Sequence, residues 1–263
     1  MLKTTAYIFF ILFAVIEINA GWVIIEVTTI NDSDNIVENT LYIQNNTIKS
    51  VDIDHEIIFD LNNWQLTVIN NELGGYWMGT PVKYLGFMKE SALSYLEEQM
   101  KSAGPDEKEM LKVLYDDLKL DMSLDSDVVS FTGELPVEII MTDNQDRILG
   151  YRVNQYRVYV DGLMAEEIWL TRDVKLDDEY DYEKFRAFMD EMSWSGLFQN
   201  YRSADSYVHL MKTGMPLRTL EETEGGAVSI TEVKSIERKD IAASEFLPPS
   251  HFRLMSLADL EFE

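Results

Sequence analysis

The segment Arg147–Thr171, RILGYRVNQYRVYVDGLMAEEIWLT, constrains the fold more than any other part of this chain. It predicts two long strands joined at Asp161-Gly162, because an Asp-Gly pair favours the two-residue turn whose positive φ angles match strand twist. Tyr156, Val158 and Val160 fall on one face of the first strand, and we expect that face to be buried. The expected framework is therefore an antiparallel sheet.

Short strands are also expected along the first part of the chain. Apolar runs there are separated by Asn-Asn, Asp-His and Gly-Gly pairs, a spacing that is typical of an antiparallel meander. The expected strands are Trp22–Thr29, Thr40–Gln44, Thr47–Ile53, Glu56–Asp60, Gln65–Asn70 and Gly75–Met78. No helix-length pattern interrupts them, so a parallel βαβ sheet is not expected.

Three amphipathic helices are predicted from apolar residues at helical spacing. They cover Leu85–Met100, Glu109–Leu118 and Tyr182–Met192. A further strand, Leu135–Thr142, lies between the second and third helices and is expected to turn at Asp143–Asp146. The order of strands and inserted helices predicts an α+β fold.

The last part of the chain is expected to add a second hairpin. Its strands are Met215–Leu220 and Ala227–Arg238, around the turn Glu224-Gly225-Gly226. His251–Leu257 is a candidate edge strand. We find neither a fixed-period repeat nor a low-complexity linker, so Gly21–Glu263 is expected to form a single domain.

Met1–Ala20 has the features of a secretory signal peptide. Lys3 supplies the positive n-region, Ala6–Ile16 is an apolar run of h-region length, and Ala20 is a small residue of the kind that signal peptidase prefers. The run is too short for a normal spanning helix, and no later segment is apolar enough to span a membrane. We expect cleavage after Ala20 and a mature chain without a transmembrane segment; an uncleaved anchor or a different cut is the alternative.

The composition excludes several classes of partner and site. The net charge is −25, with 47 acidic and 22 basic residues. Nucleic acid and anionic membrane surfaces both need Lys and Arg for neutralisation, so neither is an expected partner. The chain has no cysteine, which rules out disulfides, thiolate nucleophiles and Cys-type zinc sites.

We find no motif for catalysis, a metal or a cofactor. The three histidines, His55, His209 and His251, lack the spacing of a metal pair. The acidic stretch Asp52–Glu56 around His55 is interpreted as a solvated tight turn rather than a calcium site. Neither a Gly-x-Ser-x-Gly elbow nor a phosphate-binding loop occurs. We therefore predict no catalytic residues, no metal and no cofactor, with a carboxylate hydrolase as a remaining alternative.

The third predicted helix carries the most suggestive side chains. Phe185, Phe188, Met189 and Met192 share one face, and Trp194 follows. Methionine adapts to irregular partners, so this face is either the lining or lid of a cavity or ordinary core packed against the sheet. Met88, on the first helix, has the same two interpretations.

Several segments together resemble a family of secreted, largely uncharacterised bacterial domains. The resemblance covers most of the mature chain, and each segment is short. The segments are Ile57–Leu61, Leu66–Asn70, Tyr76-Trp77, Tyr156–Trp169, Gly214–Leu217 and Val233–Pro249.

That family is distantly similar to the periplasmic lipoprotein carriers of the Lol system. The resemblance implies an α+β fold with a long curved antiparallel sheet, an open half-barrel, and helices packed on its concave face. It also implies a periplasmic or secreted protein with a hydrophobic cavity between sheet and helices. The carriers hold the acyl chains of a lipoprotein in that cavity, and no catalytic motif accompanies the family.

Three functions follow from these observations as hypotheses. The first is a non-enzymatic binder or carrier of lipid, lipoprotein or another apolar ligand, with Phe185, Phe188, Met189, Met192 and Met88 as the lining of its pocket. The second is a protein-interaction or envelope-stress sensing module, because the same half-barrel also occurs in envelope-stress regulators. The third is the hydrolase, which would need a cleft with two facing carboxylates of raised pKa.

Overall fold

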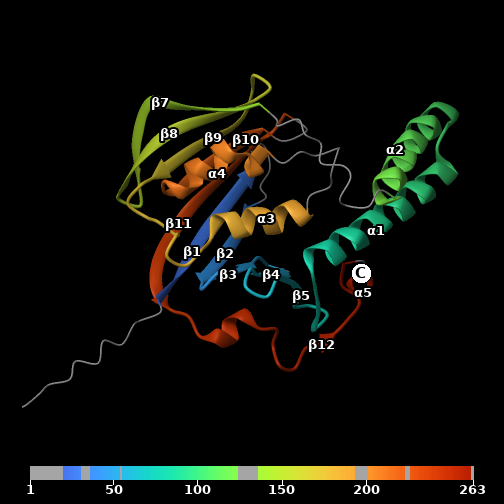
Figure 1. Cartoon of the computed structure of the whole chain (residues 1–263), viewed down its shortest axis with the longest axis horizontal. Coiled ribbons are helices and arrows are strands. Elements are labelled where there is room, and N and C mark those ends of the chain that lie inside the picture. Colours follow the sequence, from blue (N-terminus) through green and yellow to red (C-terminus); the bar gives the residue numbers. More distant parts are fainter. Residues whose placement is uncertain are drawn as a thin grey trace, which may run out of the picture.

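The computed structural model describes residues 20–30, 36–53, 55–123, 136–192, 201–222 and 226–261. In this part of the chain, one sheet of twelve strands is combined with five α-helices (Figure 1). The expected signal peptide lies outside the described residues except for Ala20, with which the first strand begins.

The strands confirm the meander and both hairpins that the sequence predicts. They are β1 (Ala20–Ile30), β2 (Ile36–Gln44), β3 (Thr47–Val51), β4 (His55–Asp60), β5 (Gln65–Asn70), β6 (Gly75–Gly79), β7 (Val137–Ile148), β8 (Tyr151–Val160), β9 (Leu163–Thr171), β10 (Met215–Glu222), β11 (Val228–Asp240) and β12 (Arg253–Leu254). Of the second hairpin's turn, Glu224 and Gly225 lie outside the described residues.

Five α-helices and two short 3₁₀ helices complete the described elements. They are α1 (Pro81–Ser102), α2 (Pro105–Ser123), α3 (Tyr182–Met192), η1 (Tyr201–Ser203), α4 (Asp205–Lys212), η2 (Ala243–Phe246) and α5 (Leu257–Glu261). All three predicted helices are thus confirmed as α1, α2 and α3, each at or beyond its predicted length.

The sheet is open, with β12 at one edge and β7 at the other. All strand pairs are antiparallel except β12 with β6, where the candidate edge strand forms and runs parallel. Helices α3 and α4 lie across one face of the curved sheet (Figure 1). This architecture confirms the predicted α+β fold, a long curved antiparallel sheet with helices on its concave face.

The central hairpin forms as predicted. Val160 pairs with Leu163, and the turn between them has φ angles of 51° at Asp161 and 77° at Gly162. Tyr156 and Val158 are buried, with 5% and 0% of their surfaces exposed, whereas Val160, next to the turn, is only partly buried. The turn joins the two strands, and the pairing shifts by one residue between Val158 and Tyr159, so this irregularity sets the register in which the face is buried.

The turn predicted at Asp143–Asp146 is wrong. Strand β7 continues through this stretch with an irregularity between Met141 and Gln145. The Gln155 Oε1 atom accepts hydrogen bonds from Thr142 Oγ1 and Asn144 Nδ2, both at 2.7 Å. These bonds hold the polar residues in a bulge within the strand. The chain turns later, at Leu149-Gly150, where both residues have positive φ angles.

Helices α1 and α2 form a hairpin that projects from the body (Figure 1). The Thr80 hydroxyl caps α1, and Pro81 occupies its first turn. Helix α2 packs along α1, and most of its side chains are exposed. The expectation that the helices pack on the concave face is therefore wrong for α2, because this helix packs along α1 instead.

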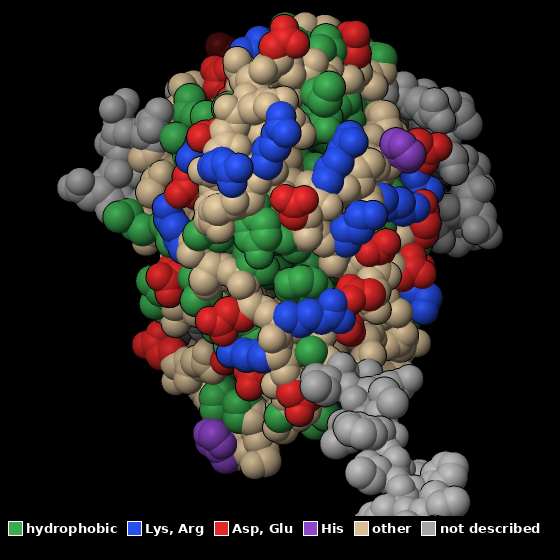
Figure 2. Space-filling model, turned by 90° about the vertical axis from the view of Figure 1, so that its left-hand side faces the viewer, with side chains coloured by type: hydrophobic (Ala, Val, Ile, Leu, Met, Phe, Trp, Pro, Cys, Tyr) green, Lys and Arg blue, Asp and Glu red, His purple; other side chains and the backbone are tan. Residues whose placement is uncertain are grey.

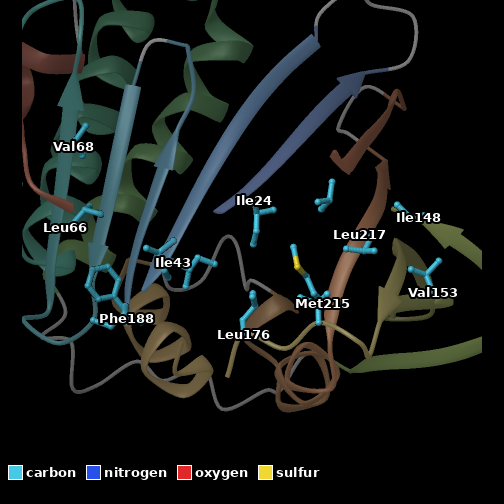
Figure 3. Close-up of a cluster of buried hydrophobic side chains, with 14 of the residues drawn as sticks. Ile24, Ile43, Leu66, Val68, Ile148, Val153, Leu176, Phe188, Met215 and Leu217 are labelled. Carbon is cyan, nitrogen blue, oxygen red and sulfur yellow. The ribbon is translucent and has the colours of Figure 1, made fainter. Parts of the chain in front are cut away.

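Two hydrophobic clusters fill the space between the sheet and the helices. The main cluster extends from Leu66 and Val68 on β5, past Phe188 of α3, to Ile148 and Val153 on β7 and β8 (Figure 3). A second cluster joins Tyr156, Val158, Ile168 and Leu170 of β8 and β9 to Tyr207 and Leu210 of α4.

The other face of the sheet carries ion pairs. Ile48 belongs to the main cluster, so the next residue, Lys49, points to the opposite face, where its Nζ lies 2.8 Å from both Glu56 and Glu245. Burial alone would lower the pKa of Lys49, but the hydrogen bonds to Glu245 and Glu56 outweigh it and raise this pKa.

Figure 2 shows the side on which β7 and β8 lie in Figure 1, where Lys and Arg side chains gather among Asp and Glu.

Candidate functional site

Helix α3 is held at its start by the turn between β2 and β3. The Asp181 Oδ1 atom accepts hydrogen bonds from the backbone N–H groups of Glu183 and Lys184, at 3.0 and 3.1 Å. The Asp181 N–H in turn donates to Asn46 Oδ1 at 2.7 Å. A carboxylate at this position satisfies unpaired amides of the first helical turn, so the acidic loop before α3 fixes where the helix begins.

Phe188 is the centre of the predicted apolar site. Its side chain is completely buried, and its ring meets those of Phe59 and Trp64 edge to face at 6.0 and 5.3 Å. Phe185 meets Phe59 in the same way, at 6.0 Å. The ring of Phe188 therefore fills a slot between β4 and the β4–β5 turn.

The other predicted site residues lie on α3 and α1 and are partly buried. Phe185 and Met192 are partly buried and pack against the main cluster, and Met189 is partly buried on the same helix. Met88 is partly buried on α1. Trp194 lies outside the described residues. The structure thus brings α3 and α1 to one side of the sheet, since these two helices contact each other.

Sequence reasoning missed four aromatic residues of this region. Phe59 and Trp64 contact Phe188, while Tyr84 and Phe87 of α1 pack against the main cluster. The strand alternation of Ile57 and Phe59 could have placed Phe59 on the buried face. No comparable signal exists for Trp64, which occupies a tight turn with a positive φ of 55°.

Two polar clefts flank the first part of α3. One, of about 460 Å³, is lined by the β2–β3 turn, the acidic loop Asp177–Tyr182 and Lys212. The other, of about 350 Å³, lies between α3 and α4. Its charged walls are paired with each other, because Lys212 bridges to Glu183 and Arg186 to Asp205. Charged groups that neutralise each other in this way hold α3 against α4.

A buried carboxylate, Glu166, lies under η1. Its oxygens accept hydrogen bonds from Tyr201 and Arg202, each at 3.2 Å, and it is only 2% exposed. Glu221 is its cross-strand neighbour, and Arg202 bridges to both carboxylates. Burial raises the pKa of the Glu166 carboxyl, an effect that the positive charge of Arg202 offsets only in part.

A carboxylate hydrolase would need a cleft with two facing carboxylates of raised pKa, and the Glu166–Glu221 pair meets part of this condition. The two acids face each other and the pKa of one is raised. Both are bridged by Arg202, however, and the Glu166 carboxylate is held by Tyr201 and Arg202. These contacts fasten η1, which contains Tyr201 and Arg202, to the sheet.

Among the described residues, no three His, Asp or Glu side chains come together as a metal site. The helices in this part of the chain also include none that combines the length and the apolar character needed to cross a membrane. At the acidic turn before β4, Asp52 Oδ1 accepts a hydrogen bond from the His55 N–H at 2.7 Å, and Asp54 lies outside the described residues.

The fold and the site together define an open-sheet α+β protein with an apolar interior under α3. Residues 131–252 match the sequence model of a family described as a domain of unknown function, DUF4412. This match confirms the predicted resemblance to an uncharacterised domain family. It covers β7–β11 and the helices between them, whereas the first three segments that carried the resemblance lie outside it. No curated protein matches the chain.

Solved structures with a similar arrangement have little sequence in common with this chain. PNGF-II is 11% identical, with a TM-score of 0.38 over 92% of this chain and 32% of its own. A MucA/MucB complex of Pseudomonas aeruginosa gives 10% identity and a TM-score of 0.38 over 91% and 59% of the two chains. A LolA superfamily protein from Nitrosomonas europaea gives 9% and 0.30, over 88% and 90%. The chain thus spans about a third of PNGF-II, and TM-scores this low assign neither ligand nor activity.

Proposed function

We propose that this protein is an exported, periplasmic or secreted, non-catalytic binder or carrier of an apolar ligand such as a lipid or a lipoprotein acyl chain. The observation that supports the proposal best is the slot that Phe188 fills between Phe59 and Trp64. In the proposed ligand-free state the ring of Phe188 occupies the site. When α3 moves outward, the ligand takes its place.

The surroundings of Phe188 suit such an exchange. Phe185, Met189, Met192 and Met88 are partly buried, so their side chains have room to rearrange. Methionine is unbranched and polarisable, and it packs tolerantly against an irregular acyl chain. A buried methylene group contributes about 0.8 kcal/mol, so an acyl chain gains enough from burial to offset the displacement of one phenyl ring.

The test is titration with a fluorescent fatty-acid probe. We expect saturable binding to the wild-type protein and tighter binding to Phe188→Ala, because the variant no longer has to expel a ring from the slot. Binding should depend little on salt, since apolar contacts are not screened. Quenching of tryptophan fluorescence by a brominated fatty acid, reduced in Trp64→Phe, would report contact with the slot.

The matched control is Ile168→Ala. Ile168 is also completely buried, but it belongs to the second cluster beneath α4. Both variants lose stability through a cavity, by about 2–5 kcal/mol, and both are checked for folding by thermal melting. Equal probe binding by the two variants, or none by the folded wild type, would refute the apolar-ligand proposal in favour of a protein-interaction or envelope-stress sensing module.

A further inference from the structure

Helix α2 carries apolar side chains on two sides, and α1 covers one of them. On the covered side Leu118 is 2% exposed and Leu111 is partly buried. Tyr115 fastens the same side to α1, since its hydroxyl donates to Glu97 Oε1 at 2.7 Å. This side accounts for the packing of the helical hairpin and leaves the second apolar side unexplained.

The second side is the α2 patch, formed by Met110, Val113 and Leu114. Their surfaces are 61%, 56% and 38% exposed. Residues three and four apart lie side by side on a helix, so the three side chains are contiguous. A soluble helix with one partner keeps a single apolar stripe, and a second one marks an interaction surface.

The acidic side chains of α2 lie next to this patch, and its lysines lie elsewhere on the helix. Asp106, Glu109 and Asp117 stand three or four residues from its members and are exposed. The lysines lie on another side of the helix, next to the surface that packs on α1. Lys119 illustrates this, because its Nζ stands 5.6 Å from the centre of the Tyr115 ring.

We propose that the α2 patch docks a basic amphipathic helix of a partner protein. Its apolar stripe would cover Met110, Val113 and Leu114, while its Lys or Arg side chains would pair with Asp106, Glu109 and Asp117. Electrostatic complementarity of this kind selects partners and speeds association. A second copy of this chain, with a net charge of −25, and an anionic membrane are both repelled by the same acidic residues.

The inference is independent of the apolar-ligand proposal, because α2 projects away from α3, the helix that carries Phe188 (Figure 1). The probe is a fluorescein-labelled amphipathic peptide of Leu and Lys at helical spacing. A Leu and Glu peptide of the same pattern is the reference. Fluorescence anisotropy should show micromolar binding of the basic peptide, weakened at least tenfold by 0.5 M salt, and no binding of the acidic one.

Two variants separate docking from general attraction between a basic peptide and an acidic protein. Val113→Ser/Leu114→Ser removes apolar surface at constant charge and should weaken binding at least tenfold. Lys112→Ser, on the lysine side of the same helix, should leave binding unweakened. All three positions are exposed, so folding should survive. Equal binding by the double variant and wild type would overturn the proposal, and so would a wild-type dimer in sedimentation that the double variant abolishes.

Discussion

Trp64 Nε1 donates a hydrogen bond to Glu191 Oε2 over 2.8 Å, and so joins the β4–β5 turn to the last turn of α3. The same tryptophan packs against Phe188. One residue thus holds α3 down by a polar bond at the rim and an aromatic contact within the core.

Breaking the rim bond should make α3 easier to displace. Glu191→Ala is expected to lower the free energy of unfolding by about 1 kcal/mol and to tighten binding of the fatty-acid probe. The measurements are urea denaturation and probe titration. Glu98→Ala, which removes an exposed carboxylate from α1, serves as the control for charge. Unchanged or weaker probe binding by Glu191→Ala would contradict displacement of α3.

The central hairpin should depend on glycine at its turn. Gly162 has a φ of 77°, a region that costs a residue with a Cβ about 1–2 kcal/mol. Gly162→Ala should therefore lower the free energy of unfolding by about that amount in urea denaturation. Gly104→Ala is the matched control, because it also has open space around it but no positive φ. A loss of stability at Gly104 as large as that at Gly162 would contradict the explanation.

Glu166 should make stability depend on pH. Its pKa is raised in the folded protein, so the folded state holds the proton more tightly than the unfolded state. Its contribution is therefore fully present below the unfolded pKa of about 4.5 and is lost as pH rises through the folded pKa. The stability of wild type relative to Glu166→Gln should fall over this window in urea titrations at successive pH values. A rise over the same window would show that Arg202 dominates the site.

Calcium should not stabilise the protein, although four acidic residues line the cleft before α3. Glu179 accepts a hydrogen bond from the Asn45 N–H and pairs with Arg238, which also pairs with Asp178. Asp181 caps α3, and Asp177 is the fourth of these acids. With three of the four carboxylates already bonded, millimolar calcium should shift the melting temperature by less than about one degree. A shift of several degrees that a chelator reverses would disprove this.

The framework of the fold was predictable because it rests on local patterns. The Asp161-Gly162 turn, the alternating strands and the periodic face of α3 each follow from neighbouring residues. The position of α2 was not predictable from the sequence, because apolar residues at helical spacing can pack equally well on another helix or on a sheet. The continuation of β7 past Asp143 depends on the hydrogen bond from Asn144 to Gln155, a residue of the next strand. The sequence around Asp143 contains no pattern that predicts this bond.

The candidate site, too, was predictable only where it depends on local sequence patterns. Periodicity identified Phe185, Phe188, Met189 and Met192 as one face, but not the partners that α3 meets across the fold. Trp64 follows two asparagines in a turn, where an exposed side chain is the usual expectation. Glu166 is one acid among 47, and its burial depends on Tyr201 and Arg202, which lie far along the chain.

The place of β1 between β2 and β11 also governs how fast the molecule assembles. Thr28 and Thr231, whose hydroxyls lie 2.8 Å apart, are separated by 203 positions in the chain. Strand β1 leaves the ribosome long before β11 and must therefore wait for it before its second edge is paired. Such high contact order makes folding slow, and until β11 arrives β1 presents an open edge to other chains. Refolding yields should consequently fall as protein concentration rises.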